Sequence, residues 1–349
     1  MKRLKALSIN LAVAATSLLV CVLLLEVVLR FCGFGNLEIY AADPHVYWRL
    51  KANQDCFTKV DHQPVHINAK STRGPDFEIP KPPGVIRILS LGDSTTFGWG
   101  LSDEQTYSRL LEKKLNEFVQ ASASASSAYS GSSKGSKPQR IEVINAGCNA
   151  WGYPQLKSFF THYGIAMQPD YVLIGGANLW TDFTEEASPE FKRAMARRVF
   201  LKNTVRRSAL YHFLFEREIS GLYNKIRTRF IPVDPTRDKI LGTSAADPML
   251  FFEKHLRELI LIAQTNKVQP VLLTIPPDRT AYTNETSDKV LAMRRRLASE
   301  LKVPHVDLAT GDWPPPGKSV YLEGDFVHLN PDGNQQVAEK LIQCFAKLL

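Results

Sequence analysis

The 349-residue sequence contains only five cysteines, and their spacing matches no zinc-binding or thiol-redox motif. His45, His62 and His66 are spaced too irregularly to indicate a metal site. No internal repeat is visible, so nothing indicates a repeat protein. With 44% hydrophobic and 22% charged residues, the composition is that of an ordinary globular protein with enough apolar residues to build a core.

Charge is absent from residues 6–25, a run of twenty residues near the N-terminus. As a helix, this run would be about 30 Å long, which is the thickness of the hydrocarbon core of a bilayer. Lys2, Arg3 and Lys5 precede it. The positive-inside rule then places the N-terminus in the cytoplasm and the rest of the chain outside.

A cleavable signal peptide is the alternative, but it would end in small residues, and residues 25–31 contain none. Cys21 also lacks the small preceding neighbour of a lipoprotein cysteine. A buried core helix is disfavoured by the basic flank and the N-terminal position. We therefore expect residues 1–30 to be an uncleaved anchor. The protein would be a single-pass inner-membrane protein whose main domain faces the periplasm, or extracytoplasmic side.

Three cysteines, Cys56, Cys148 and Cys344, would then lie in an oxidising compartment. The sequence is compatible with one disulfide among them and equally with isolated buried thiols.

The net charge of +8 is concentrated in one segment. Residues 192–229 hold eleven Lys or Arg against two Glu, within a basic insertion that we place at 185–245. Two interpretations remain open: attraction to anionic lipid headgroups or an acidic polymer, or a solvated basic surface. Nucleic acid is not an expected partner of a domain held outside the cytoplasm.

From residue 85 onward, short apolar runs alternate with amphipathic segments. The runs, expected to be strands, lie at 86–91, 141–145, 171–174, 271–275 and 305–308. The helical periods lie at 103–120, 154–167, 247–265, 285–301 and 331–348. This alternation predicts an α/β fold: a flavodoxin-like three-layer sandwich with a five-stranded parallel sheet in the order 2-1-3-4-5.

The segments around this predicted domain (85–349) are less regular. Residues 31–84 are expected to form a stem or lead-in, with an edge strand at 65–68 and a turn or linker at 80–84. Within the domain, residues 121–137 are rich in Ser, Ala and Gly and are expected to form a flexible loop.

Polar and glycine-rich clusters follow three of the predicted strands. Residues 92–94 (Gly-Asp-Ser), 145–147 (Asn-Ala-Gly) and 175–178 (Gly-Gly-Ala-Asn) each end a strand. In an open parallel sheet, ligands bind beyond the carboxyl ends of the strands. A fourth cluster, Asp325 and His328, completes the set of serine, acid and histidine that nucleophilic catalysis requires. Each cluster alone is a weak signal, and their joint occurrence at strand ends is the strong one.

Four blocks of sequence resemble the SGNH (GDSL-type) hydrolase superfamily: 91–100, 145–147, 176–178 and 325–333. The resemblance covers about residues 85–349, and residues 67–74 are similar to a lead-in of membrane-anchored bacterial members. It therefore implies the SGNH hydrolase fold. It implies no metal and no organic cofactor.

The resemblance also implies roles for individual residues. Ser94 would be the nucleophile, His328 its base, and Asp325 the group that orients the imidazole. The oxyanion hole would consist of the Ser94 N–H, the Gly147 N–H and the Asn178 side chain. The chain departs from the family pattern at the residue after Asn178, where leucine replaces the usual aspartate.

The expected function is that of a serine esterase acting on carboxylic esters, with O-acyl groups of envelope glycans or lipids as substrates. An O-acyltransferase using the same triad and a non-catalytic envelope scaffold are the alternatives. Trp99, Trp151 and Trp180 each follow a motif block, and the sequence leaves open whether they line a substrate cleft or pack in the core.

Overall fold

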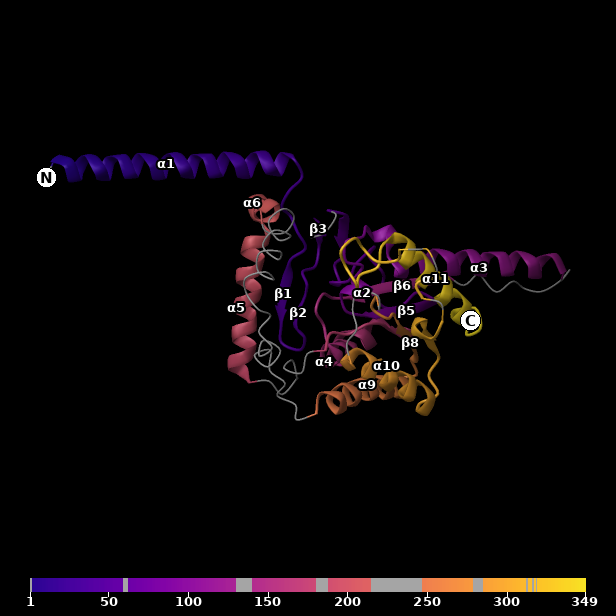
Figure 1. Ribbon diagram of the computed structural model, residues 1–349. Coiled ribbons are helices and arrows are strands. Elements are labelled where there is room, and N and C mark those ends of the chain that lie inside the picture. The colour runs from indigo at the N-terminus through magenta and orange to yellow at the C-terminus, as the bar shows by residue number, and fades with distance from the viewer. Residues whose placement is uncertain are drawn as a thin grey trace.

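The computed structural model describes residues 2–58, 62–129, 140–179, 188–214, 247–278, 285–311, 313–315, 317 and 319–349 (Figure 1). Its centre is a parallel five-stranded sheet in the order β6-β5-β7-β8-β9. The strands are β5 (Val85–Gly92), β6 (Arg140–Gly147), β7 (Tyr171–Ile174), β8 (Gln269–Thr274) and β9 (His305–Asp307). The predicted strands and their 2-1-3-4-5 order are confirmed.

Helices cover both faces of the sheet. One face packs against α3 (Tyr107–Tyr129) and α11 (Pro331–Phe345), and the other against α4 (Tyr153–Phe159), α9 (Pro248–Thr265) and α10 (Glu285–Glu300). The two resulting cores follow from the alternation of side chains along a strand. Ile88 of β5 belongs to one core and its neighbour Leu89 to the other, and both are fully buried. The molecule is the predicted three-layer sandwich.

Residues 31–84 are part of the folded domain rather than a stem beside it. They form two antiparallel hairpins, from β1 (Tyr40–Asp43) and β2 (Tyr47–Leu50), and from β3 (Gln54–Phe57) and β4 (Pro64–Ile67). β4 includes most of the predicted edge strand. The hairpins bury aromatic and aliphatic side chains in the core that α4 and α9 also line. Trp48 and Trp151 tie the hairpins to the main domain, because the Trp151 Nε1–H donates to the Trp48 carbonyl over 2.9 Å.

The loop predicted at 121–137 begins later than expected. Helix α3 continues to Tyr129, through an alternating Ser/Ala stretch in which alanine favours the helix. The remainder of the predicted loop, 130–137, lies outside the described residues. All five cysteines are free, which matches the thiol alternative.

Helices from two parts of the described chain lie outside the sandwich. Helix α1 (Lys2–Phe31) projects from the domain (Figure 1), and within it residues Ala6–Phe31 are the only described segment long and apolar enough to cross a membrane. A signal sequence has the same properties. Helix α5 (Pro189–Arg206), followed by the short α6 (Ala209–Tyr211), belongs to the predicted basic insertion, of which residues 185–187 and 215–245 lie outside the described residues.

Candidate active site

The turn that carries Ser94 joins β5 to the four-residue helix α2 (Ser94–Phe97). Asp93 caps this helix: its Oδ1 accepts hydrogen bonds from the Thr95 N–H (2.9 Å) and the Thr95 hydroxyl (2.7 Å). Burial raises the pKa of the Asp93 carboxyl, against the lowering effect of these two bonds. Asp93 therefore holds the turn that presents Ser94 at the carboxyl end of the sheet.

The loop that carries Asp325 and His328 is also held by a carboxylate. Asp325 Oδ1 accepts hydrogen bonds from the N–H groups of Val327 (2.7 Å) and His328 (2.9 Å), which closes a tight turn. The other oxygen, Oδ2, lies 2.6 Å from His328 Nδ1. His328 Nε2 in turn lies 2.9 Å from Ser94 Oγ. Three residues predicted from separate parts of the sequence thus form one chain of hydrogen bonds.

The ionisation state of Asp325 determines which atom donates in each of these hydrogen bonds. Burial raises the pKa of Asp325, but the hydrogen bond and charge of His328 and the two N–H donors outweigh it and hold the pKa at about 2. An ionised carboxylate only accepts hydrogen bonds, so Nδ1 of His328 carries the proton. In the neutral imidazole, Nε2 is then an acceptor facing the Ser94 hydroxyl.

The three tryptophans that follow the motif blocks have different surroundings. The ring of Trp99 lies beside His328, with the ring centroids 5.7 Å apart. Trp151 is buried in the core. Trp180 lies outside the described residues.

The predicted oxyanion donors differ in whether they already donate a hydrogen bond within the described protein. The Ser94 N–H is the first donor of α2, a position with no acceptor inside the helix. Asn178 is fixed by its backbone, because its N–H donates to the Trp151 carbonyl over 2.7 Å. Its side-chain amide forms no hydrogen bond with a described residue and lines a cavity next to Asp93 and Thr95.

Gly147 lies in close contact with the turn that carries Ser94. Its N–H donates to the Asn145 side chain over 3.0 Å, so this donor is already occupied. A Cβ on Gly147 would lie 2.2 Å from the Phe97 nitrogen and 2.6 Å from the Thr96 carbonyl carbon. The absence of a side chain therefore lets β6 touch the backbone of α2 directly. In the structure Gly147 packs closely against the helix that begins at Ser94.

Sequence reasoning missed the contribution of Arg73. Its guanidinium is almost fully buried and donates to Asp103 Oδ1 (2.6 Å) and to the carbonyls of Phe97 (2.7 Å), Gly98 (2.8 Å) and Leu101 (2.5 Å). Arg73 thus clamps the chain that follows Ser94. It belongs to the lead-in at 67–74. The feature of the sequence that could have indicated its role was a lone arginine among small and polar residues.

A cavity of about 510 Å³ opens beside the Ser94 turn. Leu179, Ile275, Val290 and Leu291 give it an apolar wall. The buried Arg294 also lines it, with its guanidinium held by Thr274, Tyr153 and two backbone carbonyls. The leucine that departs from the family pattern is thus part of the wall next to Asn178.

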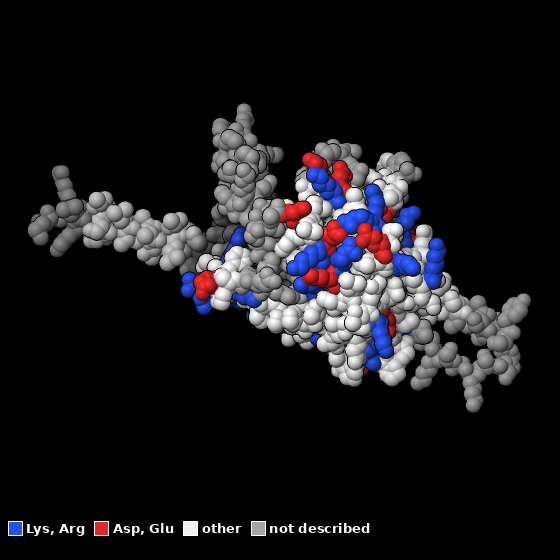
Figure 2. Space-filling model, turned by 90° about the horizontal axis from the view of Figure 1, so that it is seen from below, with Lys and Arg blue, Asp and Glu red and all other residues white. Residues whose placement is uncertain are grey.

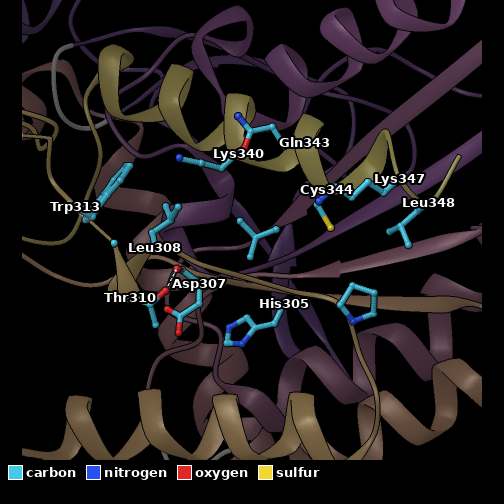
Figure 3. A pocket seen from close by; sticks show the side chains of 13 residues that line it. His305, Asp307, Leu308, Thr310, Trp313, Lys340, Gln343, Cys344, Lys347 and Leu348 are labelled. Carbon is cyan, nitrogen blue, oxygen red and sulfur yellow. Dashed lines mark hydrogen bonds between the residues drawn. The ribbon is translucent and has the colours of Figure 1, made fainter.

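A larger cavity, of about 640 Å³, lies between β9 and α11 (Figure 3). His305 and Asp307 line it from β9, and Lys340 and Cys344 line it from α11. Burial, followed by the charge of Arg294, lowers the pKa of His305 to about 4. None of the residues that line this cavity belongs to the Ser94 hydrogen-bond chain, so it is separate from the candidate active site.

A sequence model of the GDSL-like lipase/acylhydrolase family matches residues 90–336, a span that includes Ser94, Asp325 and His328. The chain belongs to this family. The GDSL-like family consists of lipases and acylhydrolases, which confirms the expected resemblance and makes the chain an ester-hydrolysing serine hydrolase.

Several solved structures of GDSL-type and related proteins resemble this one. A member of the lipolytic G-D-S-L family from Veillonella parvula is 12% identical, with a TM-score of 0.43, and the match covers 75% of this chain and 99% of that one. A lipase/acylhydrolase from Enterococcus faecalis is 13% identical (TM-score 0.44; 74% and 94% covered). A catalytic mutant of an acetylxylan esterase from Geobacillus stearothermophilus is 17% identical (TM-score 0.44; 74% and 93% covered). No curated protein matches the chain.

Proposed function

We propose that this GDSL-family hydrolase cleaves carboxylic esters through an acyl-enzyme formed on Ser94, with His328 and Asp325 as its catalytic partners. The observation that carries the proposal is the hydrogen-bond chain from Asp325 to His328 (2.6 Å) and from His328 to Ser94 (2.9 Å). Both distances are within the range that proton transfer requires.

The geometry supports a two-step reaction. Ser94 Oγ attacks the carbonyl carbon of the ester while its proton moves to His328 Nε2. The bond to the leaving alcohol then breaks, and the imidazolium returns the proton to the alcohol oxygen. A water molecule repeats the sequence on the acyl-enzyme, releases the carboxylic acid and restores Ser94. Asp325 stays ionised throughout and stabilises the imidazolium.

The negative charge that develops on the carbonyl oxygen needs donors. In the proposal these are the Ser94 N–H at the start of α2 and the Asn178 amide. One such donor is typically worth about 3 kcal/mol in the transition state. The Gly147 N–H is left out because it is engaged by Asn145.

The substrate class follows from the location of the domain. If α1 is an anchor, the three basic residues at its N-terminal end favour a domain on the periplasmic side of the inner membrane. O-acyl groups on envelope glycans, or lipid esters, are then the esters within reach. The apolar wall of the cavity next to Ser94 suits an acyl chain or a sugar face better than a highly charged substrate.

The test is hydrolysis by the detergent-solubilised full chain of a panel of nitrophenyl esters of increasing acyl length and of acetylated glycans. Ser94→Ala is the matched control. The proposal expects ester cleavage by the wild type that the control lacks. Equal rates for the two proteins would refute the role of Ser94. Adding a glycan alcohol to the same reaction separates hydrolysis from acyl transfer, since transfer gives a new ester at the expense of free acid.

A further inference from the structure

Helix α5 has an inner face that fixes it to the domain. Asn203 brackets the backbone of Tyr40, accepting its N–H over 3.0 Å and donating to its carbonyl over 2.6 Å. Arg206 is buried and pairs with the buried Glu38 at 2.5 Å. Phe191 packs edge-on against Tyr47, with the ring centroids 5.8 Å apart. The helix is therefore held rigidly against the first hairpin.

The outer face of α5 combines exposed apolar and basic side chains. Phe200 is 70% exposed, Leu201 65% and Val205 41%, so three large apolar side chains within one short stretch of the helix reach the surface. The exposed basic residues of the helix and its end are Arg193, Arg197, Arg198, Lys202 and Arg207. Against them the helix has a single acidic residue, Glu190, in its first turn.

Helices α9 and α10 carry charges of both signs that pair with one another. Figure 2 shows basic and acidic side chains intermixed on the face seen from below. On α9 and α10, Arg257 and Arg296 both pair with Glu253 and with Glu300, at distances between 2.5 and 3.1 Å. On α5 and its end, five exposed basic residues stand against the one acidic residue, Glu190, which pairs with Arg193 at 2.6 Å.

The end of α5 is tied to the base of α1. Glu26 of α1 accepts hydrogen bonds from the Ser208 hydroxyl (2.8 Å) and from the N–H groups of Ala209 and Leu210 (2.9 Å each). Arg30, which pairs with Glu26, also donates to the Arg207 carbonyl over 2.6 Å. These bonds connect the last turn of the apolar helix to the residues that directly follow α5.

The contact with α1 accompanies a particular direction of α5 relative to α1. In Figure 1, α5 runs crosswise to α1, on the side of the domain from which α1 leaves. A helix that runs crosswise to a membrane-spanning helix, and is tied to its base, is in position to lie along the surface of the bilayer. Helices that lie in a membrane interface combine apolar side chains, which enter the headgroup region, with Lys and Arg, which contact lipid phosphates.

We propose that α5 lies flat on the anionic phospholipid surface of the membrane that α1 crosses. The inference rests on the proposed anchoring by α1 and is independent of the ester chemistry. With α1 inserted and α5 docked, the domain has two attachments to the membrane and cannot swivel about the end of α1. Phosphate groups of the lipids contact the exposed basic side chains of α5, and its exposed apolar side chains enter the headgroup region.

The experiment uses the full chain reconstituted into vesicles that contain phosphatidylglycerol, with brominated lipids as quenchers of tryptophan fluorescence. Leu201→Trp places a probe on the outer face of α5. Leu261→Trp is the matched control, since Leu261 is also exposed (44%) but lies on α9, away from α1 (Figure 1). We expect most of the emission added by Leu201→Trp to be lost on bromination, and the emission added by Leu261→Trp to be retained. Equal quenching of the two probes would overturn the docking.

Two further experiments distinguish binding to anionic lipid from insertion of α1. Replacing Arg193, Arg197 and Arg198 by Gln in the Leu201→Trp chain, or using phosphatidylcholine vesicles alone, should reduce the quenching. Quenching unchanged by both would overturn the assignment to anionic lipid. Flotation of the chain with the vesicles after carbonate washing reports on α1. A chain that does not float refutes anchor and docking together, whereas a floating chain with an unquenched Leu201→Trp probe refutes the docking alone.

Discussion

Replacing Gly147 by Ala perturbs the nucleophile helix without touching a reacting atom. The new Cβ would lie 2.2 Å from the Phe97 nitrogen, whereas ordinary van der Waals contact begins at 3.4 Å. The backbone of α2 would have to move by about 1.2 Å, and Ser94 is the first residue of that helix. A misplacement of about 1 Å in an active site can cost about 100-fold in rate. We therefore expect kcat/KM for ester hydrolysis to fall by about two orders of magnitude.

The assay compares Gly147→Ala with Gly311→Ala, for which a Cβ meets nothing within 4 Å. Both variants are measured for hydrolysis of a nitrophenyl ester and for thermal unfolding. Thermal unfolding identifies a variant that has lost activity by unfolding at the assay temperature. A folded Gly147→Ala enzyme with wild-type kcat/KM would refute the reasoning. It would mean that β6 and α2 separate without displacing Ser94.

Three further predictions concern the surroundings of Ser94. Asn178→Ala should lower kcat by about 10²–10³-fold, with little change in unfolding temperature, because the amide bonds to no described residue; a smaller effect on kcat than tenfold would remove Asn178 from the oxyanion hole. Asp325 has its pKa lowered from 3.8 to about 2, so its ionised form contributes about 2 kcal/mol of stability that is present above pH 3.8 and lost as the pH falls through 2. The stability difference between wild type and Asp325→Asn, from urea unfolding, should therefore shrink between pH 4 and pH 2, and a difference independent of pH would contradict this. Arg73→Met removes the buried ion-pair partner of Asp103 and one donor from each of three backbone carbonyls, and it should cost roughly 3–5 kcal/mol in urea unfolding; a loss below about 1 kcal/mol would show that the clamp is dispensable.

The regular part of the fold was predictable because each sheet strand is a short, nearly continuous apolar run. Such runs indicate strands buried on both faces, and helical periods between them leave few arrangements open. The hairpins at 40–67 were not predictable as part of the domain, since their aromatic residues bury against partners more than a hundred positions away, as Trp48 does against Trp151. Local pattern carries no information about such contacts.

The candidate site also has residues that the sequence predicts and residues that it does not. Ser94, Asp325 and His328 could be named because their chemistry requires those side chains, and the structure brings them together. The close packing at Gly147 was not predicted because a glycine at a strand end serves equally as a donor or as a point of close approach. Only the occupied N–H and the position of α2 distinguish the two. Arg73 was missed because its partners are mainly backbone carbonyls, which leave no trace in the sequence.

The most direct measurement is the mass of the full chain after treatment with a fluorophosphonate, followed by mapping of the modified peptide. An activated serine hydroxyl displaces fluoride and retains the phosphonyl group, so the proposal predicts a single adduct on the peptide that contains Ser94. His328→Ala should slow its formation severely. A protein that acquires no adduct, or acquires one that persists in Ser94→Ala, would contradict the assignment of Ser94 as the nucleophile.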